Sequence, residues 1–141
     1  MIQAIRNYIS GTPPVAPPGD RERFEADEAL EEGAVVQLKD GGDVEKCSAN
    51  GSDAFGITLE EADAEDKVRI QYIMPGTVLK GELENEGDTD VGQKCGLNGD
   101  RNKFDGNVGG NFLVLRKYED DHDQYWAEGV FVSAAFFQDA I

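Results

Sequence analysis

The sequence predicts an all-β fold, which we expect to be a small antiparallel β-sandwich or barrel. From Phe24 onward, glycine residues separate short apolar runs at regular spacing, as is typical of antiparallel sheets. Residues 67–74 alternate between polar and apolar side chains, and residues 40–42 (Asp-Gly-Gly) provide a tight-turn signal. On this alternation the buried face carries Val68, Ile70, Tyr72 and Met74, and the exposed face carries Lys67, Arg69 and Gln71.

Eight strands are expected in the body of the chain, each a short apolar run bounded by turn residues. They span residues 34–38, 43–47, 54–59, 67–74, 77–83, 93–97, 111–118 and 124–132. Residues 25–32 precede the first of these strands and fit either one helical turn or a polar lead-in. The only late candidate for a short helix is residues 133–140, which Ser133 could cap.

The sequence contains a weak internal similarity. The matching blocks are 33–38 with 92–97, 55–66 with 112–123, and 76–78 with 129–131. The first pair shares a glycine followed by a leucine, the second runs from an apolar strand into an acidic turn, and the third joins a glycine to hydrophobic residues. A duplicated β unit and convergence on one hairpin pattern both explain this similarity, and the sequence leaves the two open.

The composition fits one globular domain and excludes several classes of partner. The chain has 141 residues and a mass of 15.3 kDa, and its 29 acidic and 13 basic side chains give a formal net charge of -16. Such a negative surface repels phosphate backbones and anionic lipids, so we expect neither nucleic-acid nor membrane partners. No apolar run approaches the roughly 18 residues of a membrane span, and no secretory signal pattern is visible at the N-terminus.

Residues 1–23 differ in composition from residues 24–141, which we expect to form a single β-rich domain. The first segment holds four of the five prolines and carries a small positive charge, whereas the negative charge lies in the rest of the chain. We interpret it as an extended N-terminal arm with an apolar tip and a stiff proline-rich spacer; a frayed terminus is the alternative. The candidate binding residues of this arm are Ile2, Ile5, Tyr8, Ile9, Pro13, Pro14, Val15, Pro17 and Pro18.

The sequence offers few groups for catalysis. Its single histidine, His122, lies in an acidic run that we expect to be a solvated turn. Cys47 and Cys95 do not have the spacing of a zinc site, and we expect free, mostly buried thiols, with a disulfide as the alternative. Because a nucleophilic cysteine or serine needs a positioned base, usually a histidine, we expect no enzymatic activity, no cofactor and no metal.

Carboxylates gather in residues 25–32, 82–90 and 119–123. The alternating acids of residues 82–90 would share one face of a strand, which must be solvated or bind cations. We favour a solvated edge, and calcium binding is the alternative. A carbohydrate-binding surface would need aromatic side chains on one face, whereas Tyr125 and Trp126 are predicted on opposite faces of their strand.

Part of the chain resembles a known family. Residues 32–38 read Glu-Gly-Ala-Val-Val-Gln-Leu, residues 54–59 read Ala-Phe-Gly-Ile-Thr-Leu, and residues 75–78 read Pro-Gly-Thr-Val. This succession of glycines and hydrophobic residues resembles the small head decoration (cement) proteins of tailed phages and related viruses. The similarity covers about a third of the chain, and the second half of the sequence fits the pattern only loosely.

The resemblance implies a virion protein, made in the host cytoplasm, that binds the outer surface of an assembled lattice of major capsid protein. It further implies a homotrimer that stabilises the viral head. Some members of the family reach neighbouring capsid subunits with an N-terminal arm, a role that residues 1–19 would suit. The alternatives are another virion β-module, such as a head-fibre base or a tail component, and a carbohydrate- or calcium-binding β-module.

Overall fold

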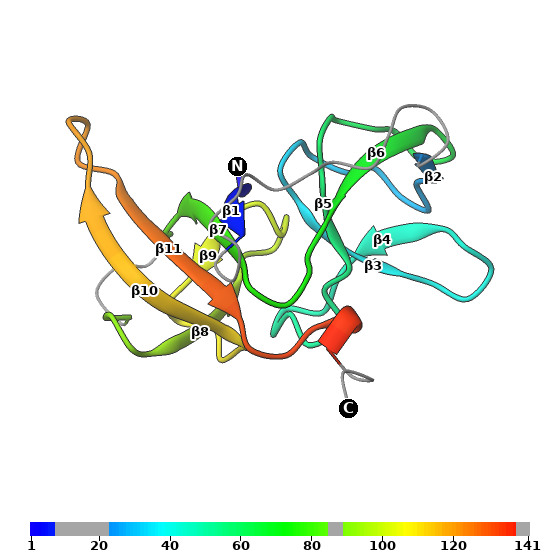
Figure 1. Ribbon diagram of the computed structural model, residues 1–141. Helices are drawn as coiled ribbons and strands as arrows, with labels where there is room; N and C mark the ends of the chain where they lie inside the picture. The colour runs from blue at the N-terminus through cyan, green and yellow to red at the C-terminus, as the bar shows by residue number, and fades with distance from the viewer. Residues whose placement is uncertain (8–22, 85–88, 138–141) are drawn as a thin grey trace.

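The computed structural model describes residues 1–7, 23–84 and 89–137, and every structural statement below concerns these residues. They form two antiparallel sheets (Figure 1), which confirms the predicted all-β fold. The six-stranded sheet has the order β1-β7-β11-β10-β8-β9, and the five-stranded sheet has the order β2-β6-β5-β3-β4. The strands are β1 (Gln3–Asn7), β2 (Arg23–Glu25), β3 (Val35–Leu38), β4 (Val44–Lys46), β5 (Gly56–Thr58), β6 (Lys67–Tyr72), β7 (Thr77–Glu82), β8 (Lys94–Leu97), β9 (Phe104–Asp105), β10 (Phe112–Glu119) and β11 (Tyr125–Phe131).

All eight predicted strands are present, with ends that differ by a few residues from those expected. The structure adds β1, β2 and β9, which are too short or too mixed in composition to show a strand pattern. At the C-terminal end, Ala135–Phe137 form a single turn of 3-10 helix (η3) in place of a longer capped helix, and residues 138–140 of that candidate lie outside the described residues.

The alternation predicted for residues 67–74 holds only as far as Ile70. Gln71 is 8% exposed and Met74 is 43% exposed, the opposite of the expectation for both side chains. Gln71 lies beside the N-terminal residues, because its side chain and residues 1–4 line the same cleft. Because β6 ends two residues before Met74, the alternation stops there, and Ile73 takes the buried position instead.

The five-stranded sheet curls until its two edges meet. A parallel bridge joins Ala26, directly after β2, to Val44 in β4, and the Asp27 N–H donates to the Val44 carbonyl at 2.8 Å. We call this curled unit, residues 23–73, the first repeat. It encloses an apolar cluster made of Ala26, Leu30, Val36, Val44, Phe55, Ala62, Val68 and Ile70.

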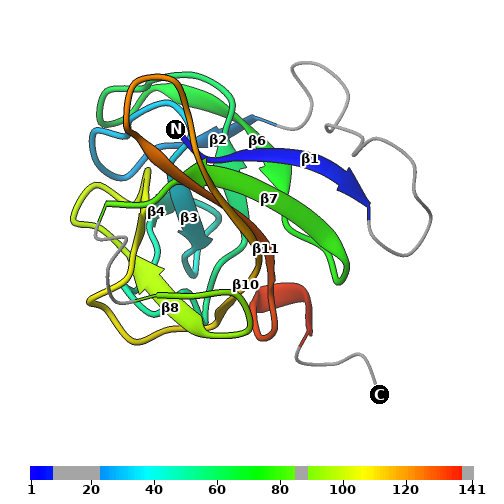
Figure 2. The ribbon, with the colours of Figure 1, turned by 90° about the vertical axis from the view of Figure 1, so that its left-hand side faces the viewer.

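The six-stranded sheet closes in the same way, apart from β1. A parallel bridge joins Leu83, directly after β7, to Phe104 in β9, and the Glu84 N–H donates to the Phe104 carbonyl at 2.8 Å. Strands β7 to β11 therefore form a second curled unit, residues 77–132, which we call the second repeat. β1 lies outside this closure and extends the sheet beside β7 (Figure 2).

The two repeats have the same strand order and the same register. In each repeat the first strand pairs with the fifth, the fifth with the fourth, the fourth with the second, and the second with the third. Val36 pairs with Gly56 in the first repeat, and Cys95 pairs with Phe112 at the corresponding position of the second. The two closing bridges described above also correspond to one another.

Backbone hydrogen bonds outside the strands are repeated as well. Gly33 and Gly92 both lie in the left-handed region, with φ of 73° and 88°, just before the second strand of their repeats. The Gly33 N–H donates to the Thr58 carbonyl at 3.0 Å, and the Gly92 N–H donates to the Val114 carbonyl at 2.8 Å. This agreement favours a duplicated β unit over convergence on one hairpin pattern.

Only some of the matching sequence blocks occupy corresponding positions in the two repeats. Residues 33–38 and 92–97 correspond in the two repeats, as do the strands that begin residues 55–66 and 112–123. The match of residues 76–78 with 129–131 is wrong, because the first of these blocks opens β7 whereas the second ends β11.

The interiors of the repeats exchange large and small side chains at corresponding positions. Where the first repeat has Gly56 and Ile70, the second has Phe112 and Gly129. A Cβ atom on Gly56 would lie 2.2 Å from Ile70 Cγ2, and one on Gly129 would lie 2.9 Å from Phe112 Cζ. Each glycine therefore makes room for the large side chain beside it, which keeps both interiors closely packed.

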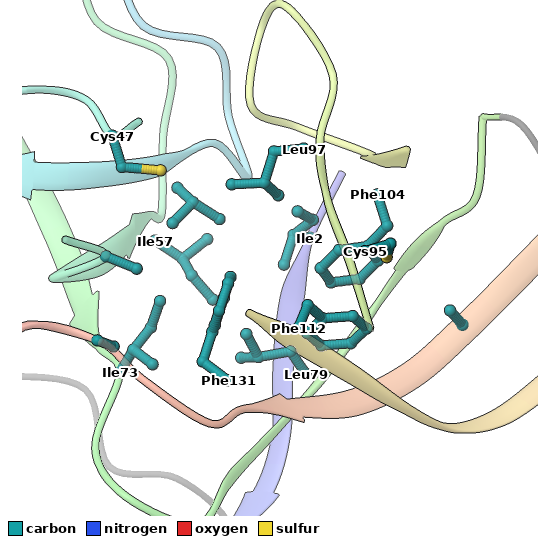
Figure 3. Close-up of a cluster of buried hydrophobic side chains, with 14 of the residues drawn as sticks. Ile2, Cys47, Ile57, Ile73, Leu79, Cys95, Leu97, Phe104, Phe112 and Phe131 are labelled. Carbon is teal, nitrogen blue, oxygen red and sulfur yellow. The ribbon is translucent and has the colours of Figure 1, made fainter. Parts of the chain in front are cut away.

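The two repeats also share a core (Figure 3), into which both the first and the second repeat send side chains. Its buried members are Ile2, Val35, Cys47, Ala54, Ile57, Ile73, Leu79, Leu83, Cys95, Leu97, Phe104, Phe112, Val114, Ala127, Phe131 and Ala134. Main-chain bonds join the repeats around this core, since the Val35 N–H donates to the Arg101 carbonyl at 2.9 Å. The described chain has no helix that is both long enough and apolar enough to cross a membrane.

Gly81→Ala tests the packing inside the second repeat. A Cβ atom there would lie 2.8 Å from both Phe104 Cε2 and Ile2 Cγ1, so we expect a loss of about 1–3 kcal/mol in the free energy of unfolding, measured in urea. Gly99→Ala is the matched control, because its added Cβ would meet nothing within 4 Å. Combining Gly81→Ala with Phe104→Leu should cost less than the two single changes together; strictly additive losses would contradict the packing explanation.

Candidate functional site

The N-terminal residues are placed differently from the predicted arm. β1 pairs antiparallel with β7, from Gln3 opposite Lys80 to Asn7 opposite Thr77. Ile2 is 1% exposed in the shared core, and Ile5 is half-buried at a shift in the register of β1. The other candidate binding residues, Tyr8, Ile9, Pro13, Pro14, Val15, Pro17 and Pro18, lie outside the described residues.

Contacts made by Met1 and Ile2 explain why the first residues belong to the body. The Ile2 N–H donates to the Gly33 carbonyl at 3.0 Å, and the Met1 ammonium group pairs with Glu82 Oε1 at 3.0 Å. The Ile2 side chain fills space between the repeats next to Phe104 (Figure 3). Ile2 is therefore part of the folded body and not the tip of an arm, because burial in the core outweighs exposure of an apolar side chain. Its role in binding stays a prediction.

Ile2→Ala measures whether the N-terminal strand is part of the folded core. We expect the free energy of unfolding to fall by about 2–5 kcal/mol, because a fully buried side chain leaves a cavity when it is shortened. The neighbouring exposed residue supplies the control, and Gln3→Ala should change stability by less than about 0.5 kcal/mol. Equal, small effects of the two changes in urea unfolding would show that residues 1–7 are a detached arm.

The strongest candidate for a binding surface is the outer face of the second repeat. Tyr118 and Trp126 are direct neighbours across β10 and β11. Lys80 Nζ lies above both rings, 5.7 Å from the Tyr118 centroid and 5.0 Å from the Trp126 centroid. The Arg116 guanidinium lies 4.9 Å from the Tyr118 centroid. We call these four residues the aromatic–cationic face.

An irregularity in β10 creates this face. Val114 is opposite Gly129, but Arg116 is opposite Glu128, so Leu115 is an extra residue in β10. Because successive strand side chains alternate between faces, Arg116 would otherwise point to the same buried side as Val114. The bulge reverses the alternation and turns Arg116, and Tyr118 after it, outward.

A nearly buried carboxylate fixes the cationic side of the face. Glu128 is 7% exposed, and its carboxylate lies 3.5 Å from Arg116 Nη1 and 3.9 Å from Arg6 Nη1. The cations are thereby held on the sheet beside the aromatic rings, in a protein whose net charge is -16. Tryptophan, tyrosine and arginine are the residues enriched at the centres of protein–protein interfaces, so this surface is suited to adhesion.

Trp126 and its neighbour Tyr125 lie on opposite faces of β11, as the sequence predicts. Tyr125 packs on the other side of the strand, where Lys117 Nζ lies 5.4 Å from its ring centroid. The sequence does not place Tyr118 beside Trp126, because that pairing depends on the register of the hairpin and on the bulge. The available signal was Ala127 between Trp126 and Glu128, which indicates that these two larger side chains share a face.

The rim of the face is held by Asp120 in the β10–β11 turn. Asp120 Oδ2 accepts a hydrogen bond from Trp126 Nε1 at 2.8 Å, and Asp120 Oδ1 accepts the N–H groups of His122 and Gln124 at 2.8 and 3.0 Å. The Trp126 bond first, and then the two backbone bonds, hold the pKa of Asp120 below its usual 3.8. His122 thus lies in an exposed turn, as expected from the sequence.

The Asp120 contact predicts an acid transition at the face. Because the pKa is lowered in the folded state, the contact is fully formed above pH 3.8 and is lost as the pH falls through the lowered value. The protein has one tryptophan, so its fluorescence should change only below that pH. Asp120→Asn should abolish the transition, and Asp121→Asn, one position along the same turn, should retain it; the reverse pattern would contradict the assignment.

The cysteines and acidic clusters do not add a reactive centre to the described residues. Cys47 and Cys95 are free and buried, as predicted, and burial raises the pKa of each thiol to about 12. Within residues 1–7, 23–84 and 89–137, no three His, Cys, Asp or Glu side chains gather closely enough to hold a metal ion. In the turn formed by residues 98–103, Asn98 Oδ1 already accepts the N–H groups of Asn102 and Lys103.

Comparison of the chain with known protein families finds no matching family, and comparison with curated proteins finds no match. The class of protein is therefore defined by the structure alone: an all-β protein of two repeats with an aromatic–cationic face on the second.

Proposed function

We propose that the protein is a capsid decoration (cement) protein, which binds the outer surface of an assembled lattice of major capsid protein and stabilises the viral head. The aromatic–cationic face carries this proposal. It presents Trp126, Tyr118 and Arg116 on a rigid sheet, with their positions set by cross-strand pairing and by Glu128. A preorganised surface loses little side-chain entropy on binding.

Two further features support the proposal. The resemblance to head decoration proteins covers residues 32–78 in the first repeat and the start of β7. The acidic remainder of the protein would face outward from the capsid, where its charge keeps particles apart. The rings of the aromatic–cationic face are already covered by Lys80, which favours a protein partner over a sugar that must stack on an open ring.

The mechanism is thermodynamic linkage. A protein that binds the assembled lattice, and not the free subunit, stabilises the assembly in proportion to its occupancy. A homotrimer would engage three capsid sites at once, and the effective concentration of the second and third contacts would increase its retention. In this proposal the protein has no reaction to catalyse, needs no cofactor, and resides on the outside of the virion after synthesis in the host cytoplasm.

Co-sedimentation with capsids of the source virus tests the proposal. Trp126→Ala should weaken binding roughly thirtyfold, the loss that is typical of an interface hot spot. Arg116→Glu should weaken it as well, because it removes a cation that lies over Tyr118. Arg69→Glu makes the same charge change at an exposed site on the first repeat and should leave occupancy unchanged.

The outcomes separate the surface from the function. Capsid binding that is equally strong for all three variants would remove the aromatic–cationic face from the mechanism. Failure of the unaltered protein to bind capsids would contradict the function itself. A contribution of residues 8–22 is measured by replacing them with a glycine–serine linker of equal length, which leaves Ile2 and β1 in place.

A further inference from the structure

Seven large apolar side chains of the described residues are exposed, and one of them is Met1. Val91, Leu115 and Val132 belong to the second repeat. Leu38 belongs to the first repeat, Met74 directly follows its last residue, and Phe136 of η3 stacks on Phe55 with the ring centroids 5.3 Å apart.

The contact between the two repeats shows how apolar side chains on the outside of a repeat become buried. Ile57 and Ile73 of the first repeat are 2% and 1% exposed, although they lie outside the cluster that this repeat encloses. They are buried in the shared core together with Leu97 and Phe131 of the second repeat (Figure 3). The contact is completed by main-chain bonds such as that from the Leu97 N–H to the Ala49 carbonyl at 2.8 Å.

Each side of this contact has an uncovered counterpart in the other repeat. The Ile73 N–H donates to the Phe55 carbonyl at 3.0 Å and the Val132 N–H to the Asn111 carbonyl at 2.9 Å, so Ile73 and Val132 hold the same position. Ile73 is 1% exposed, whereas Val132 is 41% exposed. The duplication has therefore left one copy of this surface open, on the second repeat.

The opposite side of the contact is open on the first repeat. Leu38 pairs with Val44 and Leu97 pairs with Phe104, so Leu38 and Leu97 correspond. Leu97 is 1% exposed in the shared core, but Leu38 is 43% exposed. One chain thus presents both halves of its own internal contact, at two separate places and without a partner among the residues that the structure describes.

We infer that the two open surfaces bind one another between copies of this chain. The surface of the first repeat around Leu38 docks on the surface of the second repeat around Val132 of the next copy and reproduces the contact between the repeats. Such an interface is heterologous, or head-to-tail, and it generates a ring when the rotation closes and a filament when it does not. The inference goes beyond the proposed function, because it requires no capsid.

Sedimentation velocity and light scattering on the purified full chain test this arrangement. The unaltered protein should have a mass above 15.3 kDa, and Leu38→Asp and Val132→Asp should each weaken association at least tenfold. Each variant keeps one intact surface, so an equimolar mixture of the two should form a one-to-one complex. His122→Asp, which adds a negative charge at the exposed β10–β11 turn, should associate like the unaltered protein.

Two results would overturn the inference. One is an unaltered protein that stays monomeric at its highest soluble concentration. The other is a mixture of the two variants that stays monomeric although the unaltered protein associates, because that pattern requires another interface. Circular dichroism checks that each variant is folded, and Leu38→Gln with Val132→Thr replaces any variant that is not. Capsid binding by a monomer would support the capsid-binding role while contradicting both this inference and the homotrimer. Association without capsid binding would support this inference and contradict the capsid-binding role.

Discussion

The structure depends on the closure of each curled sheet, and closure depends on complementary side-chain sizes inside it. In the second repeat, the rings of Phe104 and Phe112 stack 3.7 Å apart, and Gly81 and Gly129 give them room. With these rings in place, β9 comes within bridging distance of Leu83. The first repeat reaches the same closure with smaller side chains at the bridge. Two interiors of different composition thus produce one backbone arrangement.

Closure of the second repeat also organises its surface. The strands that send Phe112 and Ala127 inward send the aromatic–cationic face outward, since side chains alternate along a strand. The bulge at Leu115 allows β10 to serve both the interior and the outer face. Before the bulge, Phe112 and Val114 point into the interior, and after it Arg116 and Tyr118 point outward. A change in the interior packing of β10 should therefore be transmitted to the binding surface.

Much of the fold could be predicted from the sequence, because glycine spacing and apolar alternation are local signals. β1 and β2 could not be predicted, since each is short and pairs with a strand far away in the chain. β9 has a nearby partner, β8, but its two residues are too few to show a strand pattern. The four prolines and the small positive charge of residues 1–23 predict an arm. Ile2 instead packs in a core that both repeats build, which no local pattern in the sequence reveals. The pairing of Tyr118 with Trp126 required a register that composition does not encode.

The position of β1 has a consequence for synthesis of the protein on the ribosome. Ile2 and β1 leave the exit tunnel before the strand that β1 pairs with and before the rings that cover Ile2, which are made much later. The first repeat can pair its strands while the second is still being translated. β1 must therefore wait for β7 to emerge before the two strands pair, so a strand that is made early forms one of the last contacts of the fold.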